Sequence, residues 1–283
     1  MSFLGVVILI GGSAFGYGLW RGQQVIERTH GPVVSLAAPL LSSGDAKRGQ
    51  RWVDGVVRCG ECHGPDLGGK VVVDSGIGRI AAPNITSGEG SAVSGYGPSD
   101  WIRAIRHGVD PSGRGLWLLP AARFRQIADV DLADIIAYLQ RARPVDRASV
   151  PSQLTWFGKT LVGYGRLPLI AADEPMDPVV RHRPASTDTV AYGGYLITVA
   201  GCADCHGRGL QGGVSMAPLP PALVKGRAAS WSETQWRALM QTGVRPDGTE
   251  VDDSVMPVRD YMALSDEEID AMRAFVAASS AGL

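Results

Sequence analysis

The sequence has few of the features that mark several large classes of protein. Only four of its 283 residues are cysteine, too few for a small scaffold held by disulfides. Neither sign of charge prevails, because 27 Lys and Arg face 28 Asp and Glu, so we expect no nucleic-acid partner. Long regular elements are not expected either, since 37 glycines and 18 prolines interrupt helices and strands. Hydrophobic residues make up 45% of the chain, enough for a globular core in one or two domains.

Charged side chains are missing from the first twenty residues, Met1 to Trp20. Twenty helical residues reach roughly 30 Å, about one hydrocarbon thickness. A secretory signal would need a basic leading region and a small-residue cleavage site, and neither is plain here. The segment therefore predicts a retained transmembrane helix, with residues 1–44 as anchor and tether. Gly12 and Gly16 have the spacing at which two membrane helices approach closely, which favours a partner subunit there.

All four cysteines fall in two copies of one motif, Cys-X-X-Cys-His, at residues 59–63 and 202–206. This spacing is the pattern for covalent attachment of haem c, in which both sulfurs bond the porphyrin and the adjoining His binds the iron. A dithiol redox motif would need a βαβ setting that this chain does not offer. A zinc site of four cysteines would need the two distant pairs to converge. We therefore predict two haem c groups, and the residues expected to hold them are Cys59, Cys62 and His63, and Cys202, Cys205 and His206.

Whole units repeat around the two motifs. Each first cysteine is preceded by a short amphipathic stretch, with an aromatic residue, Trp52 or Tyr195, at the same spacing. A middle helix is predicted in each copy, ended by Gly108 or Gly243. A closing helix with i, i+3 apolar spacing follows. The matched middle and closing segments are residues 101–113 with 236–248, and 129–139 with 265–276.

On these residues, each half resembles a class I cytochrome c domain. The whole is similar to the membrane-anchored di-haem cytochromes c that serve as electron-transfer subunits of bacterial envelope dehydrogenases and respiratory assemblies. The resemblance implies an all-α fold with an N-terminal transmembrane helix, cytochrome c domains at 45–143 and 188–283, and a proline-rich connector at 144–187. It also implies a single-pass protein of the inner membrane whose haem domains face the periplasm. Residues 82–86 resemble the family's proline-asparagine segment beside the haem.

The two copies differ where the family places the distal ligand of its iron. The second copy has Met256-Pro257 there, so the resemblance implies Met256 as the distal ligand of a haem of relatively high potential. The first copy has Leu119-Pro120, and no Met occurs from residue 2 to residue 175. The first haem is therefore expected to have a lower potential, with a sixth position that is vacant or filled from elsewhere. His107 lies at a helix end and could instead be a capping or polar surface residue. The candidates for the sixth position, besides another subunit, are His107, Met176, His30 and His182.

Charge around the two distal turns differs in sign. Residues 103–125 hold five arginines against one acid, whereas residues 245–270 hold nine acids against two arginines. The acidic segment is either a solvated surface or a rim that steers a basic electron carrier toward the second haem. The predicted function is single-electron transfer within a larger redox complex, entering at the first haem and leaving through the second, with no catalytic residue. The rival prediction is a di-haem peroxidase-like oxidoreductase that uses an open iron at the first haem, kept in view by Leu119.

Overall fold

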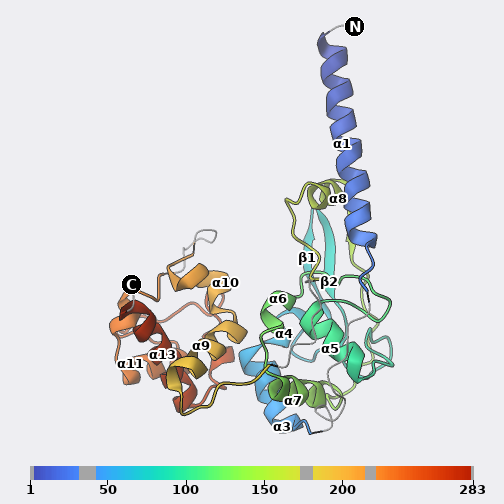
Figure 1. Ribbon diagram of the computed structural model, residues 1–283. Helices are drawn as coiled ribbons and strands as arrows, with labels where there is room; N and C mark the ends of the chain where they lie inside the picture. Colours follow the sequence, from blue (N-terminus) through green and yellow to red (C-terminus); the bar gives the residue numbers. More distant parts are fainter. Residues whose placement is uncertain (1–2, 32–42, 173–180, 214–220, 282–283) are drawn as a thin grey trace. The chain divides into compact units, whose positions relative to one another are not determined.

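The computed structural model describes residues 3–31, 43–172, 181–213 and 221–281 (Figure 1). The chain divides into two compact units. The first comprises Met1–Pro39, Gly60–Arg125 and Leu139–Val179, and the second comprises Leu40–Cys59, Gln126–Tyr138 and Val180–Leu283. Each unit therefore gathers segments that are separate in the sequence. The domain limits drawn from the repeat stay a prediction.

Short helices make up most of the regular structure, and a small sheet accompanies them. Besides the α-helices there are elements labelled η: η1 is a π-helix, and η2 and η3 are 3₁₀-helices. In chain order the elements are α1 (Phe3–Glu27), α3 (Ala46–Arg51), η1 (Trp52–Val56), α4 (Cys59–His63), β1 (Lys70–Ser75), β2 (Gly78–Ala82), α5 (Pro98–His107), α6 (Ala121–Phe124), α7 (Asp129–Leu139), β3 (Gln153–Leu154), α8 (Trp156–Gly163), α9 (Thr189–Ala200), α10 (Cys202–His206), η2 (Arg208–Leu210), η3 (Arg227–Ser230), α11 (Glu233–Thr242), α12 (Val258–Tyr261) and α13 (Asp266–Ala281).

A three-stranded antiparallel sheet interrupts the helical pattern in the first unit. β1 pairs with β2 as a hairpin, and β3 pairs with the other edge of β2. The strands form because β1 contains three β-branched residues in a row, Val71 to Val73, and glycine-containing segments lie on both sides of it. A register shift between Val71 and Val73 marks a bulge. The prediction of an all-α fold is therefore wrong, because the resemblance rests on the haem motifs and helices and says nothing of this inserted hairpin.

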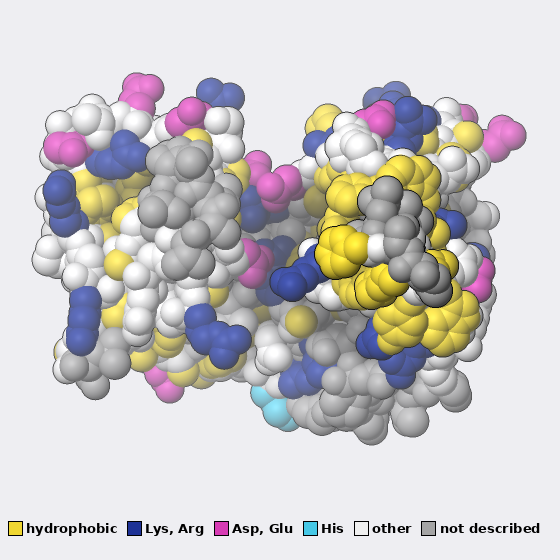
Figure 2. Space-filling view, turned by 90° about the horizontal axis from the view of Figure 1, so that it is seen from above, with side chains coloured by type: hydrophobic (Ala, Val, Ile, Leu, Met, Phe, Trp, Pro, Cys, Tyr) yellow, Lys and Arg dark blue, Asp and Glu magenta, His cyan; other side chains and the backbone are white. Residues whose placement is uncertain are grey.

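The N-terminal segment folds as α1, and its second half packs on α8. Tyr164 Oη donates a hydrogen bond to the Ala14 carbonyl oxygen at 2.6 Å. Further along, Gly22 lets the two backbones meet, since a Cβ there would lie 2.0 Å from the carbonyl oxygen of Lys159. Figure 2, seen from above, shows hydrophobic side chains gathered on this face of the molecule. The exposed aromatic residues of α1 and α8 are Phe3, Phe15, Tyr17, Trp20, Trp156 and Phe157.

Across the described residues, we find no helix with the length and apolar character needed to cross a membrane. The predicted transmembrane helix is therefore wrong, and so is the single-pass location in the inner membrane, with haem domains in the periplasm, that the resemblance implies. A physical reason lies in the packing of α1. From Ala14 onward one side of the helix contacts α8. The preceding part, residues 3–13, reaches only about 16 Å, about half the thickness of a hydrocarbon core.

The glycine pair expected to meet another subunit's helix lies in the open. A Cβ on Gly12 or Gly16 would meet no described atom within 4 Å. The close contact is made instead by Gly18 and Gly22, which have the same spacing and approach Tyr164 and Gly163 at the end of α8. Small residues four positions apart thus do allow a close helix pair here, but with other glycines and with a partner inside the chain. The predicted pairing of membrane helices is not supported.

Two helix crossings organise the second unit, and each depends on a glycine. Gly49 of α3 lies against α7, where a Cβ would come 1.9 Å from the carbonyl oxygen of Asp134. Gly193 of α9 lies against α13, where a Cβ would come 1.8 Å from the carbonyl oxygen of Ala271. Only residues without a side chain let two backbones approach so closely. Large side chains buried within this unit include Val53, Leu132, Ile135, Leu196, Ile269 and Val276.

The equal spacing of Trp52 and Tyr195 from the cysteines conceals an extra residue in the first copy. Residues 52–56 form the π-helix η1, and the Val57 N–H donates to the Trp52 carbonyl oxygen. Such an i to i+5 turn accommodates one residue more than an α-helical turn. Counted from the glycine at each crossing, Trp52 therefore corresponds to Leu196, and both are buried, at 2% and 0% exposed. By the same count, Tyr195 corresponds to Arg51.

Candidate haem sites

Each Cys-X-X-Cys-His motif forms one short helix, α4 or α10. The two cysteines of a motif are therefore i, i+3 neighbours on one helix face, and the histidine follows directly. All four cysteines are thiols rather than halves of a disulfide, and all four are partly exposed. Two thiols on one face can bond the edge of a porphyrin, with the adjoining imidazole left for the iron. The donor set of both helices therefore fits a covalently attached haem.

Both motif histidines are oriented by a proline carbonyl. His63 Nδ1 lies 2.7 Å from the carbonyl oxygen of Pro83, and His206 Nδ1 lies 2.8 Å from that of Pro221. A carbonyl oxygen only accepts, so Nδ1 is the donor in each ring and Nε2 is the nitrogen available to a metal. Burial lowers the pKa of His63, and the hydrogen bond to Pro83 partly offsets this. The lowered pKa favours the neutral imidazole of His63, the form that binds iron.

The turn after each motif histidine has the same backbone hydrogen bonds in both copies. A leucine with positive φ sits at the same place in both copies, Leu67 at 58° and Leu210 at 59°. Both leucines are buried, which offsets the strain of a backbone conformation that glycine adopts more readily. The matched hydrogen bonds run from Gly69 N to His63 O and from Gly212 N to His206 O, from Leu67 N to Gly64 O and from Leu210 N to Gly207 O, and from Ile85 N to Leu67 O and from Leu223 N to Leu210 O.

Asn84 fixes the segment that carries Pro83, and sequence reasoning assigned it no role of its own. Its side chain is fully buried. Nδ2 donates to the carbonyl oxygens of Val145 and Arg147 at 2.7 and 3.1 Å. A buried amide with both donor bonds satisfied resists displacement, so it holds the neighbouring Pro83 carbonyl in place for the motif histidine His63. The available signal was the proline-asparagine pair itself, which the resemblance placed beside the haem.

Leu119 and Met256 occupy the same position in equivalent turns. Each precedes a proline with similar backbone angles, φ −79° and ψ 58° at Pro120, and φ −75° and ψ 69° at Pro257. In each turn the N–H two residues further on donates to the carbonyl oxygen of Leu119 or Met256, at 2.8 and 2.7 Å. A one-turn helix, α6 or α12, begins directly afterwards. The second turn therefore offers a thioether sulfur where the first offers only methyl groups.

Among the candidates for the sixth position at the first motif, His107 is buried. It is the last residue of α5 and only 3% exposed, so a polar surface position for it is wrong. Gly108 ends the helix in the left-handed conformation, with φ 63°. The Leu116 N–H donates to the Gly108 carbonyl oxygen at 2.6 Å, which brings the chain leading to Leu119 beside this helix end. Met176 lies outside the described residues.

Carboxylates in the segment around Met256 are stabilised in their ionised form. Asp247 accepts hydrogen bonds from Thr249, and Asp252 accepts from the backbone N–H and the hydroxyl of Ser254, at 2.9 and 2.6 Å. These bonds lower the pKa of both carboxyls. The Met256 N–H donates to the Asp252 carbonyl oxygen at 3.0 Å. One of the acids thus belongs to the same turn as the methionine.

Comparison with known families identifies the C-terminal part of the chain. Residues 191–276 match the family model described as Cytochrome C oxidase, cbb3-type, subunit III. The matched region contains the second Cys-X-X-Cys-His motif and Met256.

The curated relatives are cytochromes or cytochrome subunits. The chain is 29% identical to a protein named diheme cytochrome c-type from Cereibacter sphaeroides, over 71% of this chain and 66% of the relative. It is 28% identical to the fructose dehydrogenase cytochrome subunit of Gluconobacter japonicus, over 52% of this chain and 32% of the relative. It is also 28% identical to the gluconate 2-dehydrogenase cytochrome c subunit of Pantoea cypripedii, over 61% and 40%. The chain thus spans less than two thirds of the length of these relatives. Together the family match and these similarities identify a cytochrome c domain in the C-terminal part of the chain, a domain whose cofactor is haem c.

Proposed function

We propose that the chain carries two covalently attached haem c groups and transfers single electrons as the cytochrome subunit of a dehydrogenase complex. The observation that carries this proposal is the repeated proximal site, in which a motif histidine gives Nδ1 to a proline carbonyl and leaves Nε2 for iron. In this proposal His63 and His206 are the proximal ligands and Met256 is the distal ligand of the second haem. The porphyrins are held by Cys59 and Cys62, and by Cys202 and Cys205.

The direction of transfer follows from the two distal turns. A thioether ligand raises the potential of a haem iron, and only the second turn supplies one, at Met256. The first haem, with Leu119 in the equivalent place, is therefore the lower-potential site. Electrons enter at the first haem and leave through the second.

The names of the relatives support the class of partner. They include cytochrome subunits of fructose dehydrogenase, gluconate 2-dehydrogenase and alcohol dehydrogenase (quinone). We infer that the first haem receives electrons from the substrate-oxidising subunit of such a complex. The acidic segment at residues 245–270 favours a basic carrier as the acceptor at the second haem.

Purified holoprotein tests the proposal. Two haems per chain are expected from the intact mass and the pyridine haemochrome spectrum, and two separate potentials are expected from an optical redox titration. A single haem per chain would end the proposal of two sites. Equal potentials, or the lower potential at the methionine-ligated haem, would contradict the direction of transfer.

A second function is favoured by Leu119. An iron with an open sixth position binds small ligands and can support peroxidase-like chemistry. Carbon monoxide binding by the reduced protein, followed by an assay for turnover with hydrogen peroxide, separates the two functions. An electron carrier whose first iron is six-coordinate binds no carbon monoxide and turns over no peroxide. Ligand binding together with peroxide turnover would instead establish the oxidoreductase.

A further inference from the structure

The residue before the first cysteine has a left-handed backbone in both copies, but the two residues differ. In the second copy it is Gly201, with φ 77°. In the first copy it is Arg58, with φ 55°. Glycine adopts this conformation without steric cost, whereas an arginine is strained in it. Such strain persists where the surroundings hold the side chain, so the contacts of Arg58 indicate what the arginine provides.

The Arg58 side chain reaches the segment that carries Met256. Its guanidinium lies over the ring of Tyr261, 5.2 Å from the centroid, and Nη1 lies 3.9 Å from Asp260 Oδ2. Only 11% of the side chain is exposed, so both the cation–π contact and the ion pair are partly shielded from water. Asp260 and Tyr261 belong to α12, whose first N–H donates to the Met256 carbonyl oxygen at 2.7 Å. A single side chain therefore links the Cys59 backbone to the methionine turn.

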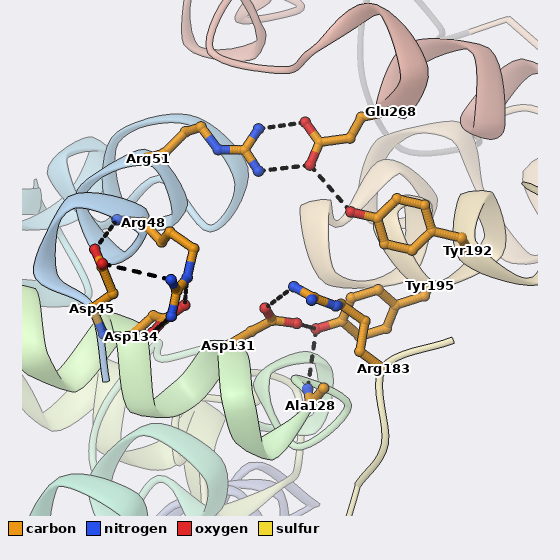
Figure 3. A network of polar contacts seen from close by, with 10 residues as sticks. All are labelled: Asp45, Arg48, Arg51, Ala128, Asp131, Asp134, Arg183, Tyr192, Tyr195 and Glu268. Atoms are coloured by element: carbon orange, nitrogen blue, oxygen red, sulfur yellow. Dashed lines mark hydrogen bonds and ion pairs between the residues drawn. The ribbon is translucent and has the colours of Figure 1, made fainter. Parts of the chain in front are cut away.

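The elements on either side of Arg58 are held together independently. Gly55 of η1 approaches the turn after α12 so closely that a Cβ would lie 2.5 Å from Ala263 Cβ. Arg51 makes two hydrogen bonds to the carboxylate of Glu268 on α13, at 2.5 and 2.7 Å, and Tyr192 donates to the same carboxylate at 3.2 Å (Figure 3). The junction formed by residues 51–58 and 258–268 is thus a packed contact, with Arg58 at the end that leads into Cys59.

We propose that Arg58 is a positioning residue that couples the two haem sites, because it ties the backbone immediately before Cys59 to the turn that carries Met256. This inference rests on the proposed function, since it requires a haem at each motif. A ferric iron carries one more positive charge than a ferrous iron. A partly buried cation therefore favours the ferrous form and raises the potential of a nearby haem, and a partly buried carboxylate lowers it.

If Arg58 couples the two haem sites, a substitution on one side of the junction should change the potential of the haem on the other side. Arg58→Gly removes the cation and also relieves the backbone strain, so the fold should persist while both potentials fall. Asp260→Asn removes the opposite charge and should raise both potentials. Each variant is adjacent in sequence to only one of the two haem sites, so a shift at the other site reports the junction. We expect the far haem to change its one-electron equilibrium constant by up to about tenfold, which corresponds to about 59 mV.

Spectroelectrochemical titration of the full-length holoprotein provides the test, with the haem count taken from the intact mass. Arg58→Lys keeps the charge but cannot stack as a planar group, so it should give smaller shifts than Arg58→Gly. Lys225→Gly is the matched control, because Lys225 is another cationic residue with positive φ, at 58°, and is exposed. Its effect should be small at about 0.15 M salt, since exposed charges are screened.

The outcomes separate the two proposals. A wild-type protein with fewer than two haems would remove the proposed function itself. Two haems in every variant, with potential shifts confined to the haem adjacent to the substitution, would overturn the coupling while leaving the proposed function in place. Loss of the methionine–iron charge-transfer absorption in Arg58→Gly, with the first haem still attached, would support the positioning role directly.

Discussion

Asp131 on α7 has a side chain with no exposed surface, and hydrogen-bond donors surround it (Figure 3). Tyr195 Oη donates to one carboxylate oxygen at 2.6 Å, and Arg183 Nη1 donates to the other at 2.8 Å. Burial raises the pKa of Asp131, and the bonds from Tyr195 and Arg183 oppose that rise. Burial and the neighbouring Asp131 also raise the pKa of Tyr195. The phenol therefore keeps its proton and remains a donor, while it accepts from the Ala128 N–H at 3.0 Å.

Removing this single hydroxyl should destabilise the fold. Tyr195→Phe leaves the Asp131 carboxylate with one donor fewer and the Ala128 N–H without its acceptor. Each buried unsatisfied group costs about 1–3 kcal/mol, so we expect the midpoint of thermal unfolding to fall by about 4–8 °C, measured by circular dichroism. Tyr164→Phe is the control, because the Tyr164 hydroxyl bonds to Ala14 in an exposed setting. An equal fall in both variants would contradict the assigned role of the Asp131 site.

The buried carboxyl of Glu268 makes the stability of the fold depend on pH, and the direction of its pKa shift gives the sign of that dependence. Burial alone would raise the pKa of this carboxyl, but the hydrogen bonds from Arg51 and from the Ser265 N–H outweigh it and lower the pKa below its ordinary 4.5. Its contribution to stability is therefore complete above pH 4.5 and is lost as the pH falls through the lower folded pKa. Glu268→Gln should melt several degrees below the wild type at pH 7, and the gap should narrow between pH 4.5 and pH 3.

The exposed Glu89→Gln variant is the control for this titration. It should follow the wild-type melting curve at each pH, because its carboxyl takes no part in the buried pair. A constant gap between Glu268→Gln and the wild type across the whole range would show that the carboxyl does not titrate with folding.

At the scale of elements, the turns before α6 and α12 are interchangeable in backbone but not in chemistry. Leu119→Met should supply a thioether in a turn that already has the required geometry. We expect the potential of the first haem to rise and a second methionine–iron charge-transfer absorption to appear. Met256→Leu is the reciprocal variant and should lower the potential of the second haem. If Leu119→Met leaves the spectrum and the potential of the first haem unchanged, then the two turns do not occupy the same place relative to their irons.

These elements also show which features a sequence can predict. Gly108 and Gly243 end α5 and α11 in the left-handed conformation, as expected, because a glycine stop is a local property. The π-helix could not be predicted, since the equal spacing of Trp52 and Tyr195 hid the extra residue. The run of three valines in β1 indicated a strand, but the resemblance to a purely helical family led to the prediction of an all-α fold.

The candidate haem sites likewise contain some features that the sequence predicts and others that only the structure reveals. The motif cysteines and histidines are consecutive or nearly so, and their spacing alone predicts a haem. The groups that orient the histidines come from elsewhere in the chain, at Pro83 and Pro221, and Asn84 acts through segments some sixty residues away. Arg58 carried no signal in the sequence. Only the comparison of its backbone with that of Gly201 reveals that the arginine is strained.

At the scale of the whole molecule, the two copies share a plan and differ in detail. The family match covers residues 191–276, whereas the first copy carries the π-helix, the inserted hairpin and Leu119. The turns after the two motif histidines nevertheless have the same backbone hydrogen bonds. The chain therefore repeats the turn after the motif histidine in both halves, and it differs in the turn that holds Leu119 or Met256.

The acidic segment around Met256 should control the encounter with a basic acceptor. Attraction between exposed charges extends about 30 Å at 0.01 M salt and only about 8 Å at 0.15 M. The second-order rate constant for reduction of a basic soluble cytochrome c, measured by stopped-flow absorption, should therefore fall steeply over this range. Because hydrogen bonds lower the pKa of Asp247 and Asp252, the salt effect should persist at pH 5.

Neutralising Asp252 and Asp253 together, as the asparagine variants, should lower the rate at low salt and flatten its dependence on ionic strength. Asparagine at 252 retains an acceptor oxygen for Ser254, so the turn before Met256 should keep its shape and the potentials should stay unchanged. Asp74→Asn on the hairpin, where the carboxylate pairs with Arg79, is the control and should leave the salt dependence intact. A rate that is insensitive to salt in the wild type, or equally altered by the hairpin variant, would show that the acceptor docks elsewhere.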